Sequence, residues 1–349
     1  MTHRPSSSFV LRTRGGWSLR LHPRPALVGL LLALLALAMT VVLIGTGDYP
    51  MSPGEVLSTL AGGGSAGQEF IVRELRLPRA LLALLVGAAL GMGGAVFQAL
   101  SRNPLGSPDI IGFTHGSAAG ALTVIVLFTG SSAAVAAGAL VGGLTTGIAV
   151  YLLAWRRGVH GYRLVLVGIG AAAMLNAVIG YLLTRANIVD AARAVLWLTG
   201  SLNGRDWEHV WPLLCACVVL IPVILSQARP LRMLEMGDDA ASALGVRVER
   251  TRLVLVLAGV LLTASATAAA GPIAFVALTA PQLARRLTRA AGPSLLSAAV
   301  MGALLLVAAD FLAQWVFASR QLPVGAVTGV LGGCYLLWLL ATERRAGRI

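Results

Sequence analysis

The sequence predicts an all-α polytopic membrane protein, with about ten transmembrane helices in a single domain. Hydrophobic residues fill 57% of the 349 positions and charged residues only 12%, and the mean hydropathy is +0.83. Soluble domains carry roughly a quarter charged residues, so this chain lacks the polar surface that water requires. Its apolar runs are long enough to cross a hydrocarbon core of roughly 30 Å, and short gaps separate them.

The predicted spans follow these runs in order, after an arginine-rich segment at 1–25. The first run is too long for a signal-peptide core and no small-residue cleavage site follows it, so it is kept as a helix. Gly271-Pro272 divides the seventh run from the eighth, because proline ends or kinks a helix and the two runs together exceed one crossing. The spans lie near 26–45, 79–100, 112–129, 132–155, 163–184, 209–227, 252–270, 272–290, 295–315 and 324–341.

Ten spans place both termini on the same side of the membrane, and the distribution of basic residues indicates which side this is. All 27 of them are arginine; with the N-terminus inside, 20 lie on the inner segments and 7 on the outer ones. The positive-inside rule therefore predicts cytoplasmic termini. A single transmembrane domain at 26–341 would then carry one long inner segment at 228–251, and a cytoplasmic tail would follow at 342–349.

The same composition excludes several functions. Without lysine the chain cannot hold an ordinary ATP-hydrolysing P-loop. The net charge is +13, and the arginines that produce it are distributed between the apolar spans and do not gather on one surface. This distribution indicates a lipid bilayer as the partner and no nucleic acid. The cysteines lie in apolar runs and the histidines lack zinc-ligand spacing, so we expect no metal and no cofactor in this chain. No nucleophile–base set appears in the spans, which disfavours a membrane enzyme.

Ionisable groups are almost absent from the spans, and Asp310 is the main exception. Ion-coupled transporters usually carry more of them, because such groups mark ion pathways. We therefore expect another polypeptide to supply the energy, with an ion-coupled secondary transporter as the alternative. Glycines four residues apart predict closely packed helices, as at Gly87 and Gly91, Gly138 and Gly142, and Gly143 and Gly147.

The inner segment 228–251 is the candidate contact with that polypeptide. Its stretch "MLEMGDDAASALG" predicts a short helix that ends at Gly245. Asp238 and Asp239 lie near the start of this helix, where the helix dipole favours acids. An ordinary amphipathic surface helix is the alternative.

The loop "SRNPLGSPDIIG" at 101–112 predicts a cytoplasmic turn between the second and third spans. Pro104 and Pro108 stop either helix from continuing, and Gly106 and Gly112 allow tight turns.

Four stretches carry a resemblance to a known family. "RLPRALLALLVGAALGMGGAVFQALSRNPLGSPDIIG", "EMGDDAASALGV", "GPIAFVALTAPQLARRL" and "LPVGAVTGVLGG" occur in this order along the chain. They resemble the iron-siderophore and cobalamin permeases of bacterial ABC importers. The resemblance implies a BtuC-like fold of ten helices per subunit, two permease subunits, two cytoplasmic ATPase subunits that hold ATP and magnesium, and an extracytoplasmic binding protein.

The resemblance also implies roles for residues. The stretch from Asp239 to Gly245 looks like the coupling loop of importer permeases, with aspartate in the place of glutamate. Arg76 and Arg79 are expected to dock acidic residues of the binding protein; the alternative is that they snorkel to headgroups. The family's further docking arginine is replaced by Gln314, and Arg320 is a candidate substitute. The ATPase-coupling residues expected in full are Glu235, Gly237, Asp238, Asp239, Ala240, Ala241 and Gly245.

The resemblance further places the 101–112 loop near the pathway axis. Asn103 and Leu105 become candidates for a cytoplasmic gate, and the His160-Gly161-Tyr162 turn becomes a second constriction. The alternative is that the loop is a plain connector.

"VALTAPQLARR", with Gln282, and "ADFLAQ" most resemble the ferric-enterobactin subgroup, as the second of two unlike permease subunits. The resemblance therefore implies a heterodimeric pore in the bacterial inner membrane. It would pass an intact ferric siderophore of catecholate type at the expense of ATP hydrolysed elsewhere. Cobalamin or haem is the alternative cargo.

Overall fold

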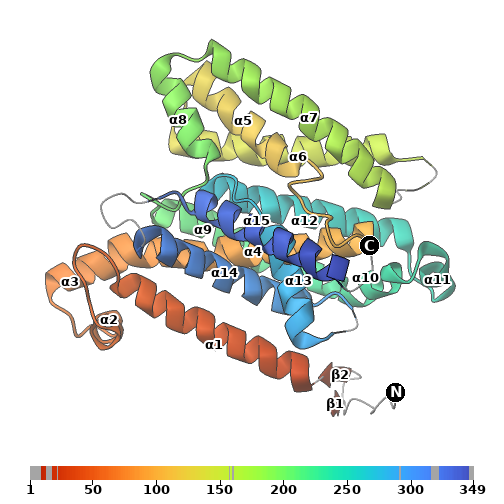
Figure 1. Ribbon diagram of the computed structural model, residues 1–349, viewed down its shortest axis with the longest axis horizontal. Coiled ribbons are helices and arrows are strands. Elements are labelled where there is room, and N and C mark those ends of the chain that lie inside the picture. The colour runs from red at the N-terminus through yellow and green to blue at the C-terminus, as the bar shows by residue number, and fades with distance from the viewer. Residues whose placement is uncertain are drawn as a thin grey trace.

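The computed structural model describes residues 9–12, 18–21, 23–156, 158, 161–290, 292–315 and 322–345, which form a helical bundle (Figure 1). Each of the ten predicted spans overlaps one of its helices. These helices are α1 (Pro23–Gly45), α4 (Leu77–Ser101), α5 (Phe113–Phe128), α6 (Ser132–Ala154), α7 (Gly161–Arg185), α9 (Trp207–Ser226), α12 (Val248–Ala270), α13 (Val276–Thr288), α14 (Leu295–Trp315) and α15 (Val324–Arg345). Before α1, β1 (Phe9–Arg12) and β2 (Ser18–Leu21) pair as a small antiparallel hairpin.

Seven helices in the described residues are long and apolar enough to cross a membrane, and α5 and α15 are shorter apolar helices. The span predicted at 272–290 is wrong in its first turn. Gly271 and Phe275 have φ angles of +77° and +68°, so the backbone turns twice before α13 begins. The 13 residues of α13 cover roughly 20 Å, less than a bilayer core.

The bundle has two layers and two distinct ends. In Figure 1, α5, α6, α7 and α8 (Ile188–Leu198) form one layer beside α4, α9, α12, α13 and α14. One end carries α2 (Pro53–Leu60) and α3 (Ala66–Phe70); the other carries α10 (Ala228–Glu235) and α11 (Asp238–Ala243). We call these the α2 end and the α11 end. The start of α1 and the end of α15 both lie toward the α11 end.

Three short helices at the α2 end were not predicted, although two carry a readable signal. Ser52 and Glu55 form a capping box at the start of α2, and Ser65 and Gln68 form one at the start of α3. This S-x-x-E/Q spacing is the sequence signature of a helix start. The π-helix η1 (Ile71–Arg76) then joins α3 to α4 without a break.

The predicted glycine contacts are confirmed. A Cβ at Gly87 would overlap the carbonyl oxygen of Gly302, and a Cβ at Gly142 would overlap that of Gly116. The pairs α4–α14 and α5–α6 therefore pack backbone against backbone, as small residues allow in lipid. Gly143 and Gly147 are likewise closed in, by the side chains of other helices.

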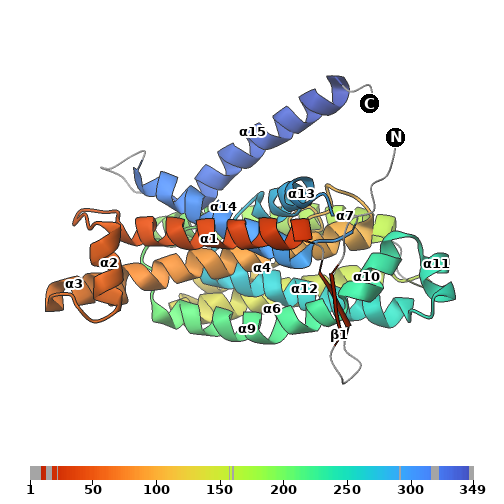
Figure 2. The same ribbon diagram turned by 90° about the horizontal axis from the view of Figure 1, so that it is seen from below.

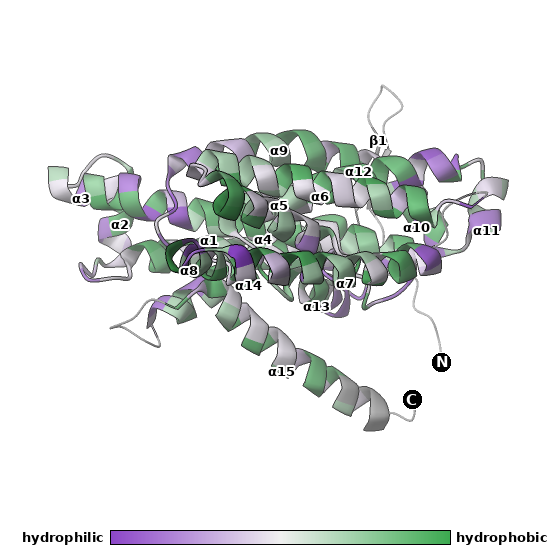
Figure 3. Ribbon diagram, turned by 90° about the horizontal axis from the view of Figure 1, so that it is seen from above, coloured by the Kyte–Doolittle hydropathy of each residue, from purple (hydrophilic) through white to green (hydrophobic). Residues whose placement is uncertain are grey.

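Hydrophobic residues dominate the middle of the bundle, and hydrophilic ones concentrate toward its two ends (Figure 3). Helix α15 diverges from the other helices along its length (Figure 2). Its residues Val330, Leu337 and Trp338 are exposed. An apolar helix with this much uncovered surface is suited to contact lipid or a second subunit.

Candidate functional site

The inner segment forms two short helices where one was predicted. Gly237, with φ +117°, separates α10 from α11. Helix α11 starts at Asp238 and ends at Ala243, and the chain leaves it through Gly245 at φ +83°. The predicted acidic start and glycine end are therefore confirmed, and the residues up to Glu235 belong to α10.

The predicted coupling residues divide between the surface and the bundle. Asp239 is exposed, Ala240 is half-buried and Ala241 is fully buried. Glu235 is half-buried, and burial raises its pKa while the charges of Arg285 and Arg232 partly offset this effect. Asp239 therefore faces outward, whereas Glu235, the last residue of α10, is partly buried near the charges of Arg285 and Arg232.

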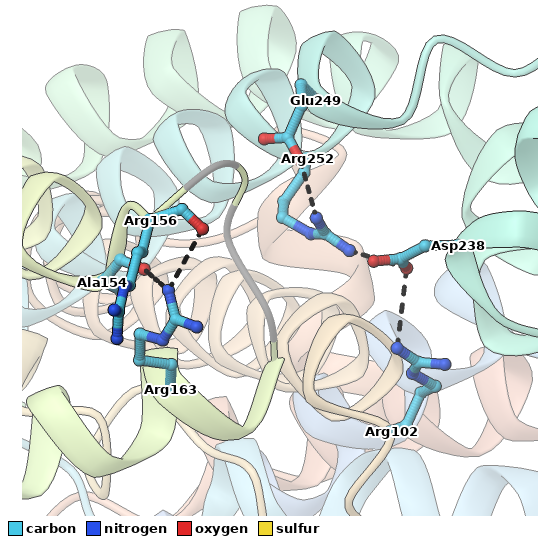
Figure 4. Close-up of polar contacts among 7 residues, drawn as sticks. All are labelled: Arg102, Ala154, Arg156, Arg163, Asp238, Glu249 and Arg252. Atoms are coloured by element: carbon cyan, nitrogen blue, oxygen red, sulfur yellow. Dashed lines mark hydrogen bonds and ion pairs between the residues drawn. The ribbon is translucent and has the colours of Figure 1, made fainter.

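An ionic cluster connects α11 to two transmembrane helices (Figure 4). Oδ1 of Asp238 lies 2.9 Å from an Arg252 nitrogen and 3.5 Å from an Arg102 nitrogen. Arg252 also donates to Oε1 of Glu249 at 3.2 Å. We call these four residues the Asp238 cluster. These ion pairs are not predictable from the sequence; the available signal is the charge of Arg252 at the start of an apolar span.

The loop 102–112 has the turn chemistry that its prolines and glycines predict, since α4 ends at Ser101 and α5 begins at Phe113. The backbone N–H of Leu105 donates to Oδ1 of Asn103 at 2.9 Å. Gln282 of α13 donates to the Pro104 carbonyl at 2.8 Å, and Thr114 donates to Asp109 at 2.6 Å. The loop is therefore held by the helices around it.

The second predicted constriction lies beside this loop. A Cβ at Gly161 would come within 2.6 Å of the Leu100 carbonyl oxygen, so α7 starts against the end of α4. Tyr162 is 78% exposed and Leu105 is also exposed. His160 lies outside the described residues.

The predicted docking arginines both have acceptors within the chain. Arg76 donates to the carbonyls of Ile44 and Tyr49, each at 2.8 Å. Arg79 donates to both carboxylate oxygens of Asp310, at 2.9 and 2.8 Å. Arg320 lies outside the described residues, and Gln314 donates to Asp310 at 3.0 Å.

One polar set has the residue types of a hydrolase triad. His209 lies 3.2 Å from the Ser132 hydroxyl and 2.8 Å from the Asp206 carboxylate, whose pKa this hydrogen bond lowers. However, an Arg205 nitrogen lies 2.8 Å from Nε2 of His209. Arg205 can only donate, so it occupies the ring nitrogen that a general base would use. The set therefore holds the start of α9 and does not form a nucleophile–base pair.

Among the residues that the structure describes, no three His, Cys, Asp or Glu side chains gather as a metal site requires. The candidate sites are thus surfaces, loops and ion pairs at the two ends of the bundle.

The sequence matches the FecCD transport family over residues 30–342. The ferric enterobactin permease FepG of Escherichia coli is 49% identical over 300 residues, covering 86% of this chain and 91% of that protein. The vitamin B12 permease BtuC of Salmonella paratyphi A is 34% identical, covering 90% and 94%. A solved structure described as an inward-facing metal-chelate type ABC transporter matches with a TM-score of 0.81 and 29% identity, covering 91% and 99%.

The expected fold class is confirmed by this neighbour, and the relatives are permeases whose ATPase is a separate subunit. The chain therefore belongs to the FecCD transport family, as a membrane permease of the siderophore and vitamin B12 type of bacterial ABC importer.

Proposed function

We propose that this chain passes an intact ferric siderophore of catecholate type across the inner membrane, driven by ATP hydrolysed on a separate subunit. The identity of 49% with a ferric enterobactin permease carries the proposal, because the vitamin B12 permease reaches only 34%. The scarcity of ionisable groups in the spans supports an external energy source. The siderophore itself holds the iron, so the pathway needs no metal ligands.

Three surfaces of the bundle are suited to bind the proposed partners. Asp239, with the exposed Met236 and Leu244 beside it, is suited to seat in an ATPase subunit. The diverging α15 offers an apolar face to a second, unlike permease subunit. The α2 end is the proposed docking surface for an extracytoplasmic binding protein. In this arrangement both termini are cytoplasmic.

Growth after deletion of the gene tests the cargo. The deletion strain is expected to lose growth when ferric enterobactin is the sole iron source and to keep growing on haem iron. Cobalamin-dependent growth is also expected to persist. Unimpaired growth on ferric enterobactin, with a defect on haem or cobalamin, would overturn the catecholate assignment.

Docking is expected to weaken when Arg76 is replaced by glutamate. The change reverses the charge of a half-buried arginine at the α2 end. An ion pair that a docked protein forms at the surface contributes about twofold to fivefold in affinity. The loss should shrink as salt rises, because mobile ions screen such pairs. Affinity of the purified binding protein for the assembled transporter measures it. Arg185→Glu, which reverses the charge of an exposed arginine at the end of α7, is the control. If both changes weaken binding equally, Arg76 has no specific role in docking.

The closed channel is expected to leak when Asn103 and Leu105 are both replaced by alanine. The substitution removes the side-chain acceptor that holds the loop and the exposed apolar side chain beside it. Dye efflux from vesicles containing the assembled, resting transporter measures the leak. Leu127→Ala alters an exposed leucine at the far end of α5 and should keep the seal. If the double variant does not leak, the loop only connects α4 to α5 and does not form the gate.

A further inference from the structure

Asp238 occupies a position that the proposed coupling function does not yet explain. It is the first residue of α11, yet its carboxylate faces two arginines of the transmembrane bundle (Figure 4). Arg252 comes from the first turns of α12, and Arg102 caps the end of α4. One carboxylate oxygen therefore lies between the coupling segment and two helices that cross the membrane.

The two contacts differ in strength. Arg252 is only 3% exposed, lies 2.9 Å from Asp238 and also donates to Glu249. Breaking the contact with Asp238 would cost the buried Arg252 its shorter ion pair and leave it with Glu249 at 3.2 Å. Arg102 is 41% exposed and lies 3.5 Å away, and exposed pairs of this kind contribute little to stability. The contact with Arg252 is therefore the anchor, and the contact with Arg102 is the one that can open and close.

Arg102 is also the residue at which the candidate gate begins. Its backbone adopts the left-handed conformation, with φ +51°, and the 102–112 loop follows directly. Near the other end of the cluster, a Cβ at Gly158 would lie 2.8 Å from Oε1 of Glu249. Gly158 belongs to the segment that joins α6 to α7 and precedes the second predicted constriction. The Asp238 cluster therefore borders both candidate gate segments.

The 102–112 loop is also held by a hydrogen bond on the side away from Asp238. Gln282 of α13 holds the Pro104 carbonyl at 2.8 Å, two residues beyond Arg102. Residues 102–104 are therefore held at one end by α13, through Pro104, and contacted at the other end by Asp238, through Arg102. A displacement of α11 that changes the Asp238–Arg102 distance acts on this short stretch. Such a stretch responds by changing its backbone angles near Arg102, where the left-handed conformation is already sparsely populated.

We propose that Asp238 is the positioning residue that transmits movement of α11 to the gate, by making its contact with Arg102 in one state of the transport cycle and releasing it in the other. Arg252 keeps Asp238 attached to α12 in both states. The proposal rests on the proposed function, since it requires ATP-driven movement of α11.

The test uses the complete transporter, with its partner permease, ATPase subunits and binding protein, in sealed vesicles. Uptake of radiolabelled ferric enterobactin and ATP hydrolysis are measured on the same preparation. Arg102→Asn is the informative variant, because it removes the charge while asparagine tolerates the left-handed backbone. We expect normal assembly and hydrolysis, with the chelate transported per ATP reduced roughly fivefold or more, the ordinary scale of coupling between sites. Arg102→Lys, which keeps the charge, is expected to restore most of the ratio.

Arg289→Asn is the matched control. Arg289 is also an exposed arginine that caps a helix in the left-handed conformation, with φ +49°, at the end of α13. Its substitution is expected to leave the transport ratio unchanged. An unaltered ratio in Arg102→Asn, an equal loss in Arg289→Asn, or loss of assembly in Arg102→Asn would each overturn the proposal. Failure of the unmodified transporter to couple uptake to hydrolysis would instead overturn the proposed function.

Discussion

Alanine in place of Arg79 is expected to destabilise the folded chain by about 3–5 kcal/mol, the usual cost of leaving one partner of a buried ion pair alone. The guanidinium of Arg79 spans both carboxylate oxygens of Asp310. The Asp310 side chain is fully buried and that of Arg79 is 15% exposed. Gln314 supplies a neutral donor to the same carboxylate, which cannot replace the lost positive charge. Thermal unfolding of the purified chain in detergent measures the loss.

A double variant separates the charge from the packing. Arg79→Leu combined with Asp310→Leu removes both charges, and such apolar replacements of buried pairs are often neutral. The double variant should therefore unfold close to the unmodified chain and well above Arg79→Ala. If the single and double variants unfold together, the ion pair is not what holds α4 to α14 at this end.

This pair changes how the docking hypothesis can be tested. Charge reversal at Arg79 would place two acids together in a buried site, so lost docking could simply report a damaged fold. Arg76 donates to the carbonyls of Ile44 and Tyr49, so its substitution removes two donors but does not leave a buried Asp310 carboxylate without its partner. Arg76 is therefore the cleaner probe of the docking surface.

The spans could be predicted because hydrophobic length is a local property of the sequence. The same local signal fails at 272–290, because a run of apolar residues does not reveal that Phe275 takes a left-handed backbone and delays α13. The division of segment 228–251 into two helices was not predicted, for a similar reason. Gly237 could have signalled it, since glycine with positive φ commonly ends a helix.

The candidate sites were less predictable, because their contacts join distant parts of the sequence. Asp310 stood out as a charge within an apolar run, yet its partner Arg79 lies 231 positions away. The contact from Gln282 to the Pro104 carbonyl spans 178 positions. Turn chemistry placed the 102–112 loop correctly from its prolines and glycines, but nothing local indicates that Asp238 reaches Arg102.

Valine in place of Gly302 is expected to destabilise the chain by about 3 kcal/mol, at the upper end of ordinary overpacking. A Cβ at this position would overlap the carbonyl oxygen of Gly87 and lie 3.0 Å from the Cα of Gly91. Both neighbours are backbone atoms of α4, so no change of rotamer relieves the overlap. Helices α4 and α14 would have to separate, and the packing that close backbone approach gives in a membrane would be lost.

Gly170→Val is the matched control, because within the described chain nothing lies within 4 Å of a Cβ at Gly170 in α7. Valine is a better helix former than glycine, so this control should unfold at or slightly above the temperature of the unmodified chain. The difference between the two variants isolates the contact between α4 and α14 from the general effect of adding a side chain. Equal unfolding temperatures would mean that these two helices do not need their close approach. A loss confined to Gly302→Val would mean that α4 and α14 depend on the close backbone approach of the glycines at 87, 91 and 302.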